Sequence, residues 1–175
     1  MSIELTLTSL MKRLEQENRL TVQLENGEIL NNVTFDWNSP ISNQELQEFS
    51  LKNPHHILPE ALCSFLQHSN GAKLFNNEGL GMDYFEIYTI HEMQNYIDEY
   101  KTNIYYQGAY DKSWVMIGAY RGYGDYMFID SQKVVNGEED YLIYVQVGDI
   151  QRLPMNFETW LDRFIVAQGA RYWLW

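Results

Sequence analysis

The sequence IGAYRGYGDYMFID, residues 117–130, joins two runs rich in aromatic and branched residues through a stretch containing Gly118, Gly122 and Gly124. A phosphate-binding P-loop requires G-x-x-x-x-G-K-[ST], and a dinucleotide-binding loop requires G-x-G-x-x-G leading into a helix. The chain has no lysine or hydroxyl at the required place, and DYMFID alternates as a strand does. We therefore predict a tight strand-to-strand connection in which Gly122 and Gly124 supply positive φ angles.

The same kinds of signal predict the elements on either side of this connection. Asn26-Gly27 between alternating apolar residues indicates a hairpin. Pro59 fits the first turn of a helix that Asn70-Gly71 would end. Further helices are predicted near residues 3–18, 42–53, 89–101 and 156–169, and strands near residues 20–25, 28–36, 84–88, 114–120, 125–130 and 141–147. Since helices and strands are segregated, we predict one α+β domain, residues 1–175, with a mixed or largely antiparallel sheet packed by helices and an N-terminal helix and hairpin.

The composition limits the classes of partner. The 175 residues carry a net charge of −12, which disfavours nucleic acid and anionic membranes because both attract basic faces. A basic protein partner would be attracted, although the same charge would also serve solubility alone. The N-terminal sequence MSIELTLTSLMKRLEQ lacks the features of a secretory signal, and no run approaches about 18 apolar residues. We therefore expect a cytoplasmic protein that does not contact a membrane.

Three segments carry a resemblance to a known family. LPEALCSFLQHSNGAKLF (residues 58–75), WVMIGAYRGYGDYMFID (114–130) and NFETWLDRFI (156–165) resemble, in order and spacing, elements of the SUKH superfamily. The resemblance covers roughly residues 54–166 and leaves residues 1–53 as an N-terminal extension and 167–175 as an aromatic tail. It implies an α+β fold. It also implies a binding role, because bacterial members are typically immunity proteins that neutralise a toxin, often a nuclease, and fungal relatives regulate cell-wall assembly.

No catalytic or metal-binding constellation stands out. Cys63 is the sole cysteine, and the four histidines form no H-x-x-x-H pair on a helix. We expect Cys63 to be partly buried and His68 to lie near a helix end, where its partial charge suits the helix dipole. A catalytic pair of Cys63 with a distant histidine remains an alternative. Asp125 and Asp130, five apart on a strand, would point to opposite faces, and Asp125 would bind amides of the adjacent turn. We predict no metal, no cofactor and no enzyme activity.

An acidic, tyrosine-rich segment is the candidate partner surface. Residues 76–111 hold seven acids and one base, and tyrosines contribute buried contact area at low entropic cost. The opposing interpretation is that the acids are solvated and the tyrosines pack the core, which we favour for Tyr88 and Tyr100. Tyr172, Trp173 and Trp175 in the tail are either core or a second anchor. The candidate partner-binding residues are Asp83, Glu86, Glu92, Asp98, Glu99, Tyr105, Tyr106, Tyr110 and Asp111.

Together these observations favour an immunity protein that binds and neutralises a basic, nuclease-like toxin through this surface. The alternative is a non-catalytic regulatory or scaffold protein that recruits endogenous partners, and a hydrolase ranks third. The sequence leaves the oligomeric state open between monomer and dimer.

Overall fold

The computed structural model describes residues 2–14, 16–24, 27–77, 84–102 and 110–175. The helices are α1 (Ile3–Arg13), α2 (Asn43–Lys52), α3 (Glu60–His68), α4 (Ile90–Thr102), α5 (Ser131–Val135) and α6 (Phe157–Val166). The strands are β1 (Arg19–Gln23), β2 (Ile29–Trp37), β3 (Ala72–Asn76), β4 (Tyr84–Ile87), β5 (Trp114–Arg121), β6 (Asp125–Asp130), β7 (Leu142–Gln146) and β8 (Asp149–Leu153). Short 3-10 turns cover Gln16–Asn18 and Tyr172–Leu174.

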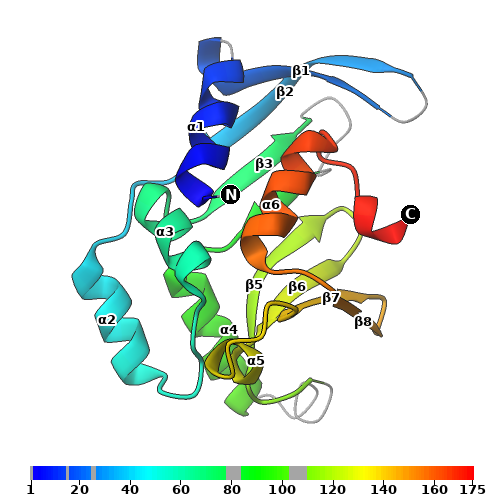
Figure 1. Ribbon diagram of the computed structural model, residues 1–175. Helices are drawn as coiled ribbons and strands as arrows, with labels where there is room; N and C mark the ends of the chain where they lie inside the picture. The colour runs from blue at the N-terminus through cyan, green and yellow to red at the C-terminus, as the bar shows by residue number, and fades with distance from the viewer. Residues whose placement is uncertain (1, 15, 25–26, 78–83, 103–109) are drawn as a thin grey trace.

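The eight strands form one antiparallel sheet in chain order, from β1 at one edge to β8 at the other. Figure 1 shows α1, α3 and α6 over one face of this sheet. The main core lies between them, where Phe85 of β4 packs against Trp160 and Phe164 of α6 at 4.8 and 5.7 Å between ring centres. The predicted α+β class and the initial helix and hairpin are confirmed, and the hairpin pairs with β3 in the same sheet.

The glycine-rich connection between β5 and β6 is the predicted tight turn. Gly122 and Gly124 have φ angles of 91° and 71°, which L-residues rarely adopt. Gly118 serves a different purpose, since it lies within β5, beside a register shift. A Cβ at this position would lie 2.4 Å from the carbonyl oxygen of Glu86, so glycine allows β4 and β5 to approach.

Two details of the helix after Pro59 differ from the prediction. Pro59 is the N-cap of α3 and not part of its first turn, and the helix ends at His68 because Ser69 is already extended. Gly71 has a φ of 83° but lies beyond the helix end, where a Cβ would meet the carbonyl oxygen of Ile87 at 2.8 Å. Asn70 accepts a hydrogen bond from the amide of Ile90 at 2.9 Å, and it therefore supports the start of α4.

Other boundaries follow the local signals to different degrees. Capping boxes at Ser42 and Thr89 begin α2 and α4 as their sequences suggest. The predicted first helix, residues 3–18, ends at Arg13, and Glu17 then has a φ of 60°. β3, α5 and β8 are five residues each and were not predicted.

The aromatic tail divides between the two expected roles. Trp173 is buried against Trp160, Phe164 and Tyr144. Trp175 is 77% exposed and Leu174 is 40% exposed, so the end of the tail lies at the surface while Trp173 belongs to the core.

Candidate functional site

Asp125 belongs to a buried ionic cluster. The prediction that it binds turn amides is wrong: its Oδ2 accepts hydrogen bonds from the Tyr144 hydroxyl, from Gln146 at 3.3 Å and from Arg171 at 2.9 Å. Arg171 also stacks on Tyr123, with 3.8 Å between the guanidinium and the ring centre. Burial, and then the bond to Asp125, raises the pKa of Tyr144, so its hydroxyl stays protonated and can donate. The cluster ties the C-terminal tail to β6 and β7.

Asp130 does not share a site with Asp125, as the strand geometry predicts. Its Oδ1 accepts hydrogen bonds from the amides of Gln132 and Lys133 and so caps α5. Its Oδ2 accepts a hydrogen bond from Arg152 at 3.0 Å. Each carboxylate therefore has its own arginine, and the two do not form an acid–base pair.

The thiol and the imidazoles show no activated nucleophile. Cys63 is half-buried, and burial followed by the nearby charge of Glu60 raises the pKa of its thiol, which is the reverse of what a nucleophilic cysteine needs. His68 is the last residue of α3, and its ring lies edge-on to Trp37. Across the described residues, no group of three or more His, Cys, Asp or Glu side chains could hold a metal ion. Within the same residues, no helix is long and apolar enough to span a membrane.

A cavity of about 760 Å³ opens at the end of the sheet where β5 begins and β6 ends, and we call it the α4 hollow. Its inner surface is mostly apolar. Aromatic and methionine side chains line much of it, among them Tyr100, Tyr110, Trp114, Met116 and Phe128. Charged and titratable side chains of both signs stand around them, namely His55, His56, Glu99, Lys101, Asp111 and Lys112.

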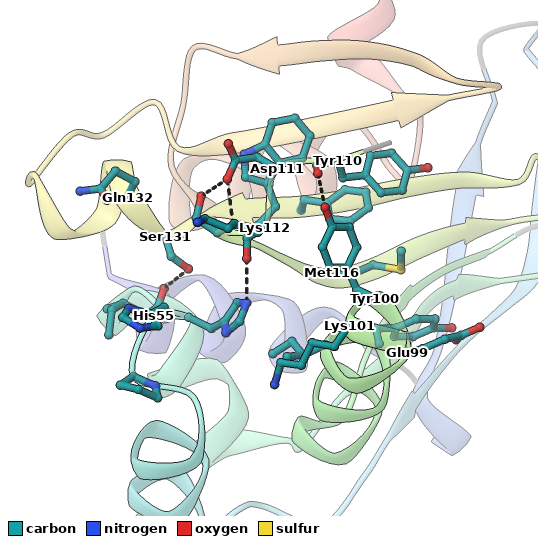
Figure 2. A pocket seen from close by; sticks show the side chains of 18 of the residues that line it. His55, Glu99, Tyr100, Lys101, Tyr110, Asp111, Lys112, Met116, Ser131 and Gln132 are labelled. Carbon is teal, nitrogen blue, oxygen red and sulfur yellow. Dashed lines mark hydrogen bonds between the residues drawn. The ribbon is translucent and has the colours of Figure 1, made fainter. Parts of the chain in front are cut away.

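Local hydrogen bonds hold the walls of the α4 hollow in place (Figure 2). The Tyr100 hydroxyl donates to the carbonyl oxygen of Tyr110, whose ring packs 4.9 Å from that of Phe128. Nε2 of His56 donates to the carbonyl oxygen of Lys112 at 3.0 Å. Burial lowers the pKa of His56, and the charge of Lys101 adds to this effect. Hydrogen bonds between different segments of the chain thus connect the walls of the α4 hollow.

The structure brings together part of the predicted partner surface. Glu99, Tyr110 and Asp111 line the α4 hollow. The amide and hydroxyl of Ser113 donate to Asp111 at 2.8 and 2.7 Å and lower the pKa of its carboxyl. Asp83, Tyr105 and Tyr106 lie outside the described residues.

The other three predicted acids, Glu86, Glu92 and Asp98, form contacts within the chain. Glu86 forms an ion pair with Arg121, with 2.6 Å between Nε and Oε2. Glu92 completes the capping box of α4.

Asp98 lies between Lys52 and Lys101 at 3.2 and 3.5 Å. Partial burial tends to raise the pKa of Asp98. Hydrogen bonds from Lys52 and Gln94 outweigh this effect, and the pKa is lowered overall. Of the two tyrosines expected in the core, Tyr88 is fully buried and Tyr100 is half-buried against the hollow.

Most of the apolar lining of the α4 hollow was not among the predicted site residues. Trp114, Met116 and Phe128 are on strands it had predicted, and alternation along β5 and β6 places them on the face opposite the helix-covered core. Residues 54–57 form another wall. The available signal was that these strands are apolar on both faces, which a sheet covered on one face does not require.

The fold and site define an α+β protein with one eight-stranded antiparallel meander and an aromatic hollow at the end of its sheet. The chain belongs to the SMI1/KNR4 family (SUKH-1), which it matches over residues 40–163. The match begins at residue 40, and it therefore includes α2, which the sequence resemblance had left in the extension. Proteins of the SUKH family are generally non-catalytic immunity proteins.

Two relatives from Bacillus subtilis (strain 168) are similar along most of their length. The chain is 30% identical to the uncharacterized protein YobM over 179 residues, covering 97% of this chain and 90% of YobM. It is 28% identical to the uncharacterized protein YnaB over 148 residues, covering 82% of this chain and 90% of YnaB. The similarity to YobM thus extends beyond the family match into the N-terminal helix and hairpin.

Proposed function

We propose that this protein is an immunity protein that binds and neutralises a cognate bacterial toxin, a basic and nuclease-like one. We further propose that the contact surface is centred on the α4 hollow, with Glu99, Tyr110 and Asp111 from the acidic, tyrosine-rich segment at its rim. Asp83, Tyr105 and Tyr106, which belong to the same segment, remain candidates for this surface.

The α4 hollow is the observation that carries the proposal. Aromatic and methionine side chains such as Tyr110, Trp114 and Met116 are the types that interfaces favour, because tyrosine and tryptophan bury large areas with few rotatable bonds and methionine adapts its shape to a partner. A cavity of about 760 Å³ can accept one or more side chains of a partner, and anchors in such pockets dominate binding energy. The net charge of −12 would draw in a basic partner over a longer range.

The test is to look beside the gene for a reading frame that encodes a toxin-like domain, to co-express that toxin with this protein, and to measure affinity at low and high salt. We expect the protein to protect cells and to bind the toxin with a salt-sensitive association rate. Glu99→Lys should weaken binding about tenfold, because it places a second cation beside Lys101 on the rim. Glu48→Lys, which makes the same charge change on an exposed position of α2, is the matched control and should leave affinity within about twofold.

Two outcomes would contradict the proposal in different ways. Full protection and unchanged affinity with Glu99→Lys would remove the hollow as the contact surface. Absence of protection, together with salt-insensitive capture of several regulatory proteins of the host, would favour the alternative of a scaffold protein.

A further inference from the structure

The edge strand β8 presents unpaired backbone groups on its outer side. Val147 and Gly148, with φ angles of 48° and 89°, form a two-residue turn of the type I′ class between β7 and β8. In such a hairpin the residues next to the turn, Gln146 and Asp149, exchange both backbone hydrogen bonds, and the pattern alternates from there. The N–H and C=O of Ile150 and Arg152 therefore point away from β7.

Among the described residues, no neighbouring element pairs with this outer side. Residues 149–152 are all exposed, and the Ile150 side chain is 49% exposed. In the part of the chain that the structure describes, no other element donates to or accepts from the backbone of Ile150 or Arg152. The pairing of β7 with β8 is regular, without the register shift that interrupts the β1–β2 and β5–β6 pairs.

The side chains of β8 connect its edge to the α4 hollow. Ile150 is paired with Val145, so its side chain extends the apolar cluster of Phe128, Ile143 and Val145. Arg152 is paired with Ile143 and lies 5.6 Å above Trp114, a lining residue of the hollow. A strand added beside β8 would thus lie along the same face of the sheet and lead toward the hollow.

The charges at this edge indicate the kind of strand that would fit. Arg152 is neutralised by Asp130 at 3.0 Å. Asp149 is exposed, and among the described residues no cation forms an ion pair with it. A matching strand would place an apolar side chain beside Ile150 and a lysine or arginine beside Asp149.

We propose that the toxin binds by adding an extended strand to the outer edge of β8, with an adjoining side chain in the α4 hollow. This inference rests on the proposed immunity function and specifies its binding mode. Backbone hydrogen bonds to Ile150 and Arg152 would supply affinity in a largely sequence-independent way, and the hollow would supply specificity.

The test compares proline at an outward and at an inward position of β8. Ile150→Pro removes an N–H that the β7–β8 ladder does not use, and proline is tolerated on edge strands. We expect this variant to fold normally and to bind the toxin identified in the co-expression test, used as a purified domain, at least about tenfold more weakly. Ile150→Ala, which keeps the N–H, should lose less affinity. Gln151→Pro, whose N–H points toward β7, should instead lower the melting temperature.

The outcomes separate this inference from the function on which it rests. Protection by the wild type with Ile150→Pro binding within about twofold of it would overturn strand addition and leave the immunity function standing. Failure of the wild type to bind the toxin would overturn both. A dimer of the chain alone that Ile150→Pro dissociates would assign the edge to a second copy and overturn the toxin strand.

Discussion

The two edge strands of the sheet, β1 and β8, differ in the regularity of their pairing and in the contacts on their outer sides. At the β1 edge, the pairing with β2 shifts register between Leu20 and Val22, and the amide of Gln23 donates to the side chain of Gln168 at 2.7 Å. At the β8 edge, pairing is regular and the outward groups of Ile150 and Arg152 meet no other described element. Proteins commonly blunt sheet edges to prevent unwanted pairing. An edge left regular beside an aromatic hollow is therefore the better candidate for recognition.

We call the β1 edge, which bonds to Gln168, the closed edge, and the β8 edge the open edge. The contact at the closed edge depends on how the C-terminal tail is held in place. Gln168 lies two residues beyond the end of α6. The carbonyl oxygen of Gly169 accepts a hydrogen bond from Tyr120 at 2.9 Å, and Arg171 pairs with the buried Asp125. The tail thus holds Gln168 against β1. A second cavity, of about 640 Å³, lies between the β1–β2 hairpin and this tail.

The largest expected effect comes from removing the tail's buried charge. Arg171→Ala leaves the carboxylate of Asp125 buried without its cation, and breaking a buried ion pair in this way costs about 3–5 kcal/mol of unfolding free energy. Chemical denaturation would measure the loss. The comparison at the open edge is Arg152→Ala, which should cost less, because the Arg152 side chain is 50% exposed and Asp130 keeps its hydrogen bonds from the amides of Gln132 and Lys133. Equal losses for the two variants would show that the edges do not differ in this respect.

A smaller effect is expected at the closed edge itself. Gln168 has a φ of 55°, and asparagine tolerates this conformation, so Gln168→Asn shortens the side chain with little added backbone strain. Losing the bond to Gln23 should cost about 1 kcal/mol. Amide hydrogen exchange should accelerate at Gln23 and stay unchanged at Gln151, which lies in the opposite edge strand. Unchanged exchange at Gln23 would mean that Gln168 does not close this edge.

The smallest effect concerns pH and the end of the sheet that carries the hollow. Burial lowers the pKa of His56 in the folded protein, so as pH falls below about 6.5 the unfolded chain binds a proton that the folded chain resists. The contribution of His56 to stability is therefore fully present above that pH and is lost below it. His56→Asn should flatten the decline in melting temperature between about pH 7 and 5, whereas His91→Asn, at an exposed site on α4, should not. A wild-type profile identical to that of His56→Asn would contradict this account.

The two edges also show why sequence patterns predict some elements and miss others. The turn at Gly122 and Gly124 and the capping boxes of α2 and α4 each depend on residues within four positions of one another. The same holds for the predicted Asn26-Gly27 turn between β1 and β2, of which Asn26 lies outside the described residues. β8 was missed because it is five residues long and four of them are exposed, so its sequence DIQRL shows no apolar alternation. An edge strand that faces solvent loses the pattern by which strands are recognised.

The candidate site was predicted only in part for a related reason. Sequence alone identified an acidic, tyrosine-rich segment, and Glu99, Tyr110 and Asp111 of that segment do meet at the hollow. It could not show that Glu86 pairs with Arg121, 35 residues away, or that Asp98 pairs with Lys52, 46 residues away. Which carboxylates remain available to a partner depends on these distant contacts.

The amino-acid sequence by itself determined the α+β class, the glycine turn, most helix starts and the resemblance to the SUKH proteins, because turns, caps and apolar periodicity act over a few neighbouring residues. The tertiary structure decided the rest: the burial of Asp125 against Arg171, the α4 hollow, and the contrast between a closed and an open sheet edge. These features depend on desolvation and on contacts between residues tens of positions apart, and such contacts exist only once the sheet has brought its strands together.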